Sequence, residues 1–429
     1  MKEKFVLGFV SAIIFMLFSS TYAPIGRAWY NSTYPWSQSQ HDAQHTGASE
    51  STAPSSNSTI WTYSTGTVDQ RARNLIVDDG RVYGIRGDSF FVLDEMTGVF
   101  VLSGGEGGDY ETNVGGAYAA EKIYYTSYDI YGGGMIYCYN ATSGDELWTY
   151  DTSPAQIRHP PTLSGNRVYV GTLNNYVYCI EDGVLKWSKE LGGLTYSAPA
   201  VDGDLFCIGC DDGKLYAFNI TGVQPISLWN FTVGNSITGP ITINDDKVYF
   251  SGGNGYLYVL DKTDGQLIWS WKSKSDEELE IAVASGIVYV STNIIQGGLY
   301  ALYANVTGGN YTYSSPEPLL WGDETADGSY GIAIAGNTLF YVDLNNILHA
   351  RSTLTGTNLW SFQLGFGAIA PIVADGHVFV ADQNQVYCIG STTIPEFTLP
   401  ITILLFGILT LTAIGLRKRR YSHKESIFD

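Results

Sequence analysis

The stretch "GYLYVLDKTDGQLIW", residues 255–269, contains an apolar strand, a turn with glycine at its end, and a second strand that carries tryptophan. Variants of it recur along the chain, among them "GKLYAFNITG" (213–222), "NYVYCIEDGVLKW" (175–187) and "GMIYCYNATSGDELW" (134–148). Apolar and polar residues alternate in these strands, so each strand has one face for each kind of side chain. The recurrence predicts a repeat protein built from β-strands.

A second motif precedes each copy, of the form V-x-D/G-G/N-x-V/L-Y/F, which is typical of a tight hairpin between two apolar strands. Its copies begin at Val77, Tyr118, Leu163, Val201, Ile243, Val283, Ile334 and Val373. The two motifs together predict units of four strands and about 40 residues. Because such a unit cannot cover its own two faces, we expect an all-β, eight-bladed β-propeller over residues 59–390, with four-stranded antiparallel blades.

The fourth strand of most units carries tryptophan at one repeat position. These residues are Trp61, Trp148, Trp187, Trp229, Trp269, Trp321 and Trp360. We expect these rings to serve packing, with Phe100 in the same position of the first unit. Trp29, Trp36 and Trp271 fall outside the pattern and are weaker candidates for surface contact.

Closure of the ring is also predicted from the strand pattern. The last unit ends at residue 390 after three strands, whereas the strand at 59–66 has no unit of its own. We therefore expect residues 59–66 to complete the eighth blade. This arrangement joins the two ends of the ring and removes two open sheet edges.

The repeat at 213–222 and 255–269 resembles that of the pyrroloquinoline quinone (PQQ)-like propeller superfamily, G-x-L-Y-A-L-D-x-x-T-G-x-x-x-W. The superfamily includes quinoprotein alcohol dehydrogenases and the non-enzymatic BamB-like lipoproteins of outer-membrane assembly. The stretch "WSQSQHDAQHTGASES" at 36–51 resembles the leading segment of archaeal secreted members. The resemblance implies the fold and the docking of each fourth-strand tryptophan between neighbouring blades. It does not choose between an oxidoreductase and a scaffold.

The N-terminus predicts export. Residues 1–23 combine a charged start, a long apolar run and a small-residue end, which is the layout of a secretory signal. A leading segment follows at 24–58, before the propeller.

The C-terminus predicts a membrane anchor. The apolar run at 398–416 is long enough to cross a bilayer as one transmembrane helix, and the basic cluster after it places residues 417–429 in the cytoplasm. The linker at 391–397 contains Pro395, Glu396 and Phe397. Together with the apolar and basic segments it resembles the PEF-CTERM sorting tail of archaeal surface proteins. That resemblance implies an archaeosortase as a partner and a lipid in place of the tail, while a plain membrane-spanning anchor is the alternative.

Side chains that vary between units lie where the innermost strands begin, beside the central channel. They are Arg73, Asn113, Arg158, His159, Tyr196, Glu280 and Tyr330. Variation on a fixed ring is how a propeller builds a binding site, so we take these residues as binding candidates at the channel mouth. The alternative is a set of unrelated polar residues around a water-filled channel.

Metal and thiol chemistry have little support in the sequence. His41 and His45 are four residues apart, but their surroundings lack helical periodicity, so we expect a solvated loop and no metal site. Three cysteines occupy the small-residue position of a third strand, where we expect buried thiols: Cys138, Cys179 and Cys388. Cys207 and Cys210 are three residues apart, and a local disulfide between them is an open alternative.

The resemblance to quinoprotein enzymes implies an adjacent Cys-Cys pair, a stacking Trp, a calcium site of Glu and Asn, and a catalytic Asp. The chain has no adjacent cysteine pair and no match to the calcium segment. We therefore expect no cofactor and no catalytic residue, with a quinoprotein-like oxidoreductase that binds PQQ and calcium at the channel mouth as the alternative. A polysaccharide-degrading enzyme would need paired carboxylates in one groove, and the acids here are scattered through turns.

The sequence as a whole predicts a cell-surface, membrane-anchored propeller that binds envelope or surface proteins, or glycans. The net charge of −19, from 42 acidic and 23 basic residues, argues against nucleic acid as a partner. We expect contacts through the flat faces or through the insertion at 303–318. This insertion also holds glycosylation sequons at Asn305 and Asn310.

Overall fold

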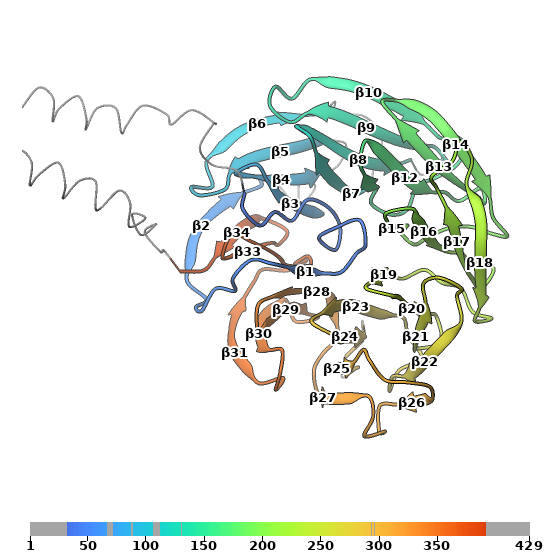
Figure 1. Cartoon of the computed structure of the whole chain (residues 1–429). Coiled ribbons are helices and arrows are strands. Elements are labelled where there is room, and N and C mark those ends of the chain that lie inside the picture. Colours follow the sequence, from blue (N-terminus) through green and yellow to red (C-terminus); the bar gives the residue numbers. More distant parts are fainter. Residues whose placement is uncertain are drawn as a thin grey trace, which may run out of the picture. The chain divides into compact units, whose positions relative to one another are not determined.

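In the computed structural model, strands of eight separate sheets follow one another around a ring (Figure 1). The described residues are 32–66, 72–86, 89–105, 112–129, 131–292, 294–295 and 297–391, and the side chains at 112 and 113 are not among the described atoms. Each sheet is one blade, and the eight-bladed, all-β architecture predicted from the repeat is confirmed. Successive strands within a blade are antiparallel.

The first four blades have four strands each. Blade 1 consists of β3 (Asn74–Asp78), β4 (Arg81–Arg86), β5 (Ser89–Asp94) and β6 (Phe100–Gly104). Blade 2 consists of β7 (Thr112–Ala119), β8 (Lys122–Tyr128), β9 (Gly134–Asn140) and β10 (Glu146–Asp151). Blade 3 consists of β11 (Thr162–Ser164), β12 (Arg167–Gly171), β13 (Tyr176–Glu181) and β14 (Val184–Glu190). Blade 4 consists of β15 (Ala200–Asp202), β16 (Leu205–Gly209), β17 (Lys214–Asn219) and β18 (Ile226–Thr232).

Two of the remaining blades have a fifth strand. Blade 5 consists of β19 (Ile241–Asn244), β20 (Lys247–Gly252), β21 (Tyr256–Asp261), β22 (Leu267–Lys272) and β26 (Asn310–Thr312). Blade 6 consists of β23 (Leu279–Ala284), β24 (Ile287–Thr292), β25 (Leu299–Tyr303) and β27 (Leu319–Asp323). Blade 7 consists of β28 (Ser329–Ala335), β29 (Thr338–Asp343), β30 (Ile347–Ser352), β31 (Asn358–Gln363) and β1 (Ala48–Ser49). Blade 8 consists of β32 (Ile372–Ala374), β33 (His377–Ala381), β34 (Gln385–Ile389) and β2 (Thr59–Ser64).

The ring closes through β2, as the strand count predicted. β2 pairs antiparallel with β34, and Trp61 lies opposite Cys388. The N-terminal strand therefore supplies the fourth strand of the last blade. The unpaired edges that an incomplete eighth blade would leave are removed.

The tryptophans of the fourth strands link neighbouring blades. The indole N–H of Trp61 donates to the backbone oxygen of Glu95 in blade 1 at 2.8 Å. Trp229, Trp269 and Trp321 donate to backbone oxygens of the next blade in the same way. Trp360 donates to Pro54 O, in the segment before β2. Each of these contacts satisfies the polar N–H group of a large ring. The indole N–H groups of Trp148 and Trp187 have no partner among the described residues.

The prediction that Phe100 takes the tryptophan position of blade 1 was wrong. Trp148 lies opposite Cys138 in blade 2, and the equivalent pair in blade 1 is Leu102 opposite Val92. Phe100 lies on the other side of the β-bulge and is 47% exposed. In blades 2, 3, 5 and 7 the tryptophan stands four residues after the turn glycine, as in Gly265 and Trp269, and the same count from Gly98 leads to Leu102.

The insertion at 303–318 contains a strand, β26. It pairs parallel with β22, where Ser270 lies opposite Asn310. The middle of the insertion from blade 6 thus extends the sheet of blade 5. It is part of the fold, rather than the free interaction loop that the sequence suggested.

The five cysteines are buried, and none of them forms a disulfide within the described part of the chain. Cys207 and Cys210 therefore form no local disulfide. Burial raises the pKa of Cys179 to about 11, so this thiol stays protonated at neutral pH.

No helix long and apolar enough to cross a membrane occurs among the residues that the structure describes. The expected signal (1–23), sorting motif (Pro395, Glu396, Phe397) and transmembrane span (398–416) all lie outside those residues.

Candidate functional site

Residues 32–51, called the strap below, cross the centre of the ring (Figure 1). The strap contacts the innermost strand of one blade after another, mainly through backbone hydrogen bonds. In blade 1, Trp36 and Val77 exchange both backbone bonds, at 2.7 and 3.0 Å. In blade 7, the strap forms β1 and pairs parallel with β28.

The donors to the strap occupy one position of the sequence repeat. The backbone N–H of the first residue in the hairpin motif donates to a strap oxygen in blades 1 to 7. These donors are Val77, Tyr118, Leu163, Val201, Ile243, Val283 and Ile334. In blade 8, the N–H of Gly376 donates to Ser51 Oγ at 2.7 Å. Because all these positions lie where the inner strands end, the strap covers that end of the channel.

Expectations for three residues were wrong. His45 was expected in a solvated loop and Trp36 was a weaker candidate for surface contact, but they are only 1% and 3% exposed. Trp271 was a candidate for surface contact and is fully buried in the core around blades 5 and 6. These aromatic rings are buried because tertiary contacts cover them, which the local sequence pattern did not predict.

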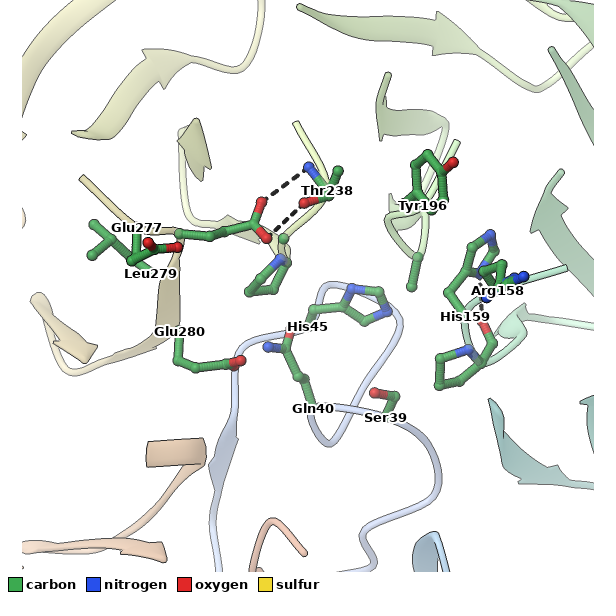
Figure 2. A pocket seen from close by; sticks show the side chains of 15 residues that line it. Ser39, Gln40, His45, Arg158, His159, Tyr196, Thr238, Glu277, Leu279 and Glu280 are labelled. Carbon is green, nitrogen blue, oxygen red and sulfur yellow. Dashed lines mark hydrogen bonds between the residues drawn. The ribbon is translucent and has the colours of Figure 1, made fainter. Parts of the chain in front are cut away.

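The other end of the channel opens into a cavity of about 460 Å³ (Figure 2). Its base is made by strap residues Ser39, Gln40 and His45, and its walls come from blades 3 to 6. A smaller cavity of about 160 Å³ adjoins it on the side of blades 7, 8 and 1. The channel is thus a recess closed at one end, rather than the open water-filled pore considered from the sequence.

The structure brings most of the predicted binding candidates to these cavities. Arg158, His159, Tyr196 and Glu280 line the larger one. Arg73, Tyr330 and Glu280 line the smaller one. The side chain of Asn113 lies outside the described atoms.

His159 is held by the fold. The backbone N–H of Gly171 donates to its Nε2 at 3.0 Å, so Nδ1 carries the proton and donates to Pro160 O at 2.9 Å. Burial lowers the pKa of His159, so the ring is neutral. With both nitrogens bonded to backbone, His159 shapes the wall and has no free group for a ligand.

His45 lies in the base of the recess and is also neutral, because burial lowers its pKa to about 4. Its Nε2 lies 3.3 Å from Thr162 Oγ1. The Thr162 hydroxyl donates its proton to Pro199 O at 2.6 Å, so it accepts from the ring. Thr162 therefore fixes the strap to the inner ends of blades 3 and 4.

The acids of the recess cluster on the wall nearest blade 6. Glu278 accepts hydrogen bonds from Thr238 N at 3.0 Å and from Thr238 Oγ1 at 2.6 Å. Glu280 has no such donor among the described residues. Burial, together with the charge of Glu278, raises the pKa of Glu280 to about 7.

Arg158 lies across the recess from these acids (Figure 2). Its guanidinium donates to Gln156 Oε1 at 2.8 and 3.1 Å and stacks 4.1 Å from the ring centre of Tyr128. The cation is exposed to the mouth but is held by its own blades. A ligand can reach the Arg158 guanidinium only at the edge that faces away from Gln156 and Tyr128.

Sequence reasoning missed several residues of the recess. Thr238 and Glu278 stand just before the inner strands of blades 5 and 6, where the same repeat position would have found them. Ser39 and Gln40 come from the strap, and no repeat marks them. Their only signal was the resemblance of residues 36–51 to the leading segment of archaeal secreted members of the superfamily.

A serine–histidine–aspartate array elsewhere has a structural explanation. His349 Nδ1 lies 3.1 Å from Ser361 Oγ, and Nε2 lies 3.0 Å from Asp343 Oδ2. The same strand position carries Tyr216 in blade 4 and Tyr387 in blade 8, and each donates to an aspartate. The array is therefore blade 7's version of a repeated contact that fixes the turn after the second strand.

Comparison with known families assigns the repeat. The profile described as outer membrane protein assembly factor BamB matches residues 51–226, 226–317 and 313–393. BamB of Yersinia pestis is 27% identical over 309 residues, which cover 67% of this chain and 76% of that protein. BamB of Escherichia coli (strain K12) is 25% identical over 271 residues, covering 58% and 68%.

Solved structures with the same fold include both non-enzymes and enzymes. BamB from Moraxella catarrhalis superposes with a TM-score of 0.60 at 15% identity, covering 78% of this chain and 100% of that one. Quinohemoprotein alcohol dehydrogenase from Comamonas testosteroni gives 0.67 at 15% identity, covering 86% and 83%. At this identity the similarity establishes the fold and leaves the activity open.

Proposed function

The chain belongs to the family of outer membrane protein assembly factor BamB, and from this premise we propose that it is a non-catalytic scaffold propeller of the cell envelope. Its partners are other envelope proteins, as the name of its relatives, outer membrane protein assembly factor, suggests for those proteins. The observation that carries the proposal beyond family membership is the outer edge of blades 3 and 4.

The outer strands of these two blades expose aliphatic side chains. Val184 on β14 is 60% exposed and Ile226 on β18 is 62% exposed. Both strands end their sheets, so one side of each backbone is left without a strand partner in the described part of the chain. An extended segment of another protein fits such an edge, because backbone bonds provide affinity and alternate side chains pack against the aliphatic residues.

Blade 5 illustrates that geometry within the chain itself. There β26 adds to the outer strand β22 and covers Ser270, which is 3% exposed. The blades of this propeller are closely similar repeats, so a partner strand can add to blades 3 and 4 in the same manner.

The recess does not fit PQQ and calcium. PQQ is a polycarboxylate, and the wall nearest blade 6 presents Glu277, Glu278 and Glu280. The chain has no adjacent cysteine pair, and no group of three His, Cys, Asp or Glu in the described residues could hold a metal ion. We therefore derive no oxidoreductase step for this protein.

The anchoring scheme remains part of the proposal. We infer export through residues 1–23 and attachment through 398–416, or through a lipid added by an archaeosortase at Pro395-Glu396-Phe397. Asn305 and Asn310 are exposed, which supports them as glycan acceptors, although Asn310 Oδ1 accepts a hydrogen bond from Ser270 Oγ. The intact mass of the protein taken from membranes separates a retained tail from a lipid and counts the glycans.

The partner surface is tested by cross-linking the full chain in its native membranes. We expect a discrete complex for the natural chain, and its loss in the double variant Val184→Glu, Ile226→Glu. The control is Val223→Glu, because Val223 is 85% exposed but lies in the turn before β18 rather than on an edge strand. If all three proteins give the same complex, or if none gives one, the proposed surface is wrong.

A further inference from the structure

The two cavities of the recess meet at three residues. Ser39, Gln40 and Glu280 line both the larger and the smaller cavity, so they stand at the junction. Gln40 and Glu280 approach each other from the strap and from β23 (Figure 2). A ligand that enters the mouth and reaches the base of the recess passes these side chains.

Both side chains present oxygen atoms without a donor. Gln40 Oε1 is buried and has no hydrogen-bond partner among the described residues. Glu280 lies deep in the recess, and none of the described residues donates a hydrogen bond to its carboxylate. Buried acceptors are normally satisfied, because each unsatisfied one costs about 1–3 kcal/mol. The Glu280 side chain is partly exposed to the recess, so a ligand in the recess can supply a donor to its carboxylate.

The basic side chains that line the larger cavity are engaged elsewhere. Arg158 is held by Gln156 and Tyr128, and both ring nitrogens of His159 are bonded to backbone. Three acids line one wall of the larger cavity, Glu277, Glu278 and Glu280, whereas the smaller cavity adds one basic side chain, Arg73. The excess of acids on the wall of Glu280 disfavours an anionic ligand and favours a cation with several N–H donors.

Aromatic rings flank the route to the junction. Tyr196 at the mouth of the larger cavity is 37% exposed, and Tyr330 beside the smaller one is 44% exposed. An ammonium group is attracted to the face of such a ring, and its methylene chain packs well against it. The larger cavity, at about 460 Å³, admits an aliphatic chain of this kind.

We propose that the junction binds a primary ammonium group, with the Glu280 carboxylate as its counter-ion. The ammonium belongs either to a small aliphatic amine or to a lysine side chain of a protein that covers the mouth. The site itself does not depend on the scaffold role, and only a lysine as the source rests on that proposed function.

Binding is measured by titration calorimetry on the full chain in a mild detergent at pH 8. The probes are n-butylamine, a lysine-containing peptide and the same peptide with Nε-acetyl-lysine. n-Butanol and butyrate are the neutral and anionic controls. We expect saturable binding of an amine, no binding of the controls, and affinity about tenfold weaker in Glu280→Gln. Glu190→Gln is the matched control, because this acid is exposed on β14, outside the recess, and we expect its affinity within about twofold of the natural chain.

The outcomes distinguish a small amine from a lysine side chain as the source of the ammonium group, and they can refute the proposed site. Binding of n-butylamine indicates that a small amine suffices, whereas binding of the lysine peptide alone indicates a protein partner. If neither amine binds, or if Glu280→Gln binds them as tightly as the natural chain, the proposal is wrong. Cross-linking at blades 3 and 4 succeeds or fails independently, so failure of this site and failure of the scaffold role are distinguishable.

Discussion

The two ends of the central channel are built on different principles. Where the inner strands end, the strap is bound mainly by backbone N–H groups, which every blade offers whatever its side chain. Where they begin, each blade presents a different side chain, from Arg158 to Tyr196 to Glu280. The repeat therefore provides a uniform surface that the chain covers with its own segment. Its variable positions gather at the opposite end, where they remain accessible.

The largest expected effect comes from disturbing the closed end at Gly47. This residue has φ +66°, and an added Cβ would lie 2.9 Å from Ala282 Cβ and 3.1 Å from Ile332 O. We expect Gly47→Ala to lower the free energy of unfolding by about 2–4 kcal/mol, measured by denaturant titration. Gly203→Ala is the control, since its φ is +56° with nothing within 4 Å of the added Cβ. It should cost about 1 kcal/mol. Equal losses would mean that the strap does not pack as described.

Removal of a polar contact at the closed end should have a somewhat smaller effect. Thr162→Val leaves the Pro199 carbonyl and the His45 ring without their partner, at an expected cost of about 1–3 kcal/mol. Tyr196→Phe removes a hydroxyl at the open end, and we expect a change within about 0.5 kcal/mol. Thermal unfolding of both variants measures the contrast. A larger loss for Tyr196→Phe would reverse the assignment of the two ends.

Substitution of Glu280 at the open end should raise the free energy of unfolding, whereas the substitutions at the closed end lower it. Its pKa is about 7 in the folded protein against 4.5 as the ordinary value, so the folded state binds the extra proton between these pH values. Stability therefore falls as pH rises from 4.5 to 7 and stays low above it. Glu280→Gln should raise the free energy of unfolding by about 1–3 kcal/mol at pH 8 and leave it nearly unchanged at pH 4.5.

The pH profile of that variant also tests the surroundings of the carboxylate. Glu278 is the charge that acts on Glu280, and the recess is further lined by Glu277, Arg158 and the neutral rings of His45 and His159. The smallest effect is expected for Glu277→Gln, whose carboxylate is exposed, within about 0.5 kcal/mol at either pH. If Glu280→Gln is destabilising at pH 8, the carboxylate has a donor that the described contacts do not include.

The sequence by itself determined the blades, their number and their closure. Period-two alternation and the hairpin motif follow from local geometry. At Asp79 and Gly80, for example, φ is +50° and +65°, which a tight hairpin requires and which Asp-Gly accepts readily. The count of strands placed residues 59–66 beside the last strand of the eighth blade, because an incomplete blade leaves edges that the spare strand can cover. The register, with Trp61 opposite Cys388, came from the structure.

Only the tertiary structure decided what closes the channel and which side chains are free at its mouth. The strap has no strand or helix pattern of its own, and its conformation comes from backbone donors on eight blades, which no side-chain pattern records. His45 and Trp36 are buried for that reason. At the mouth, the repeat correctly placed both His159 and Glu280, but it could not reveal that the backbone satisfies the first and leaves the second without a donor. Hydrogen-bond partners depend on distances between blades, and those distances exist only once the ring has closed.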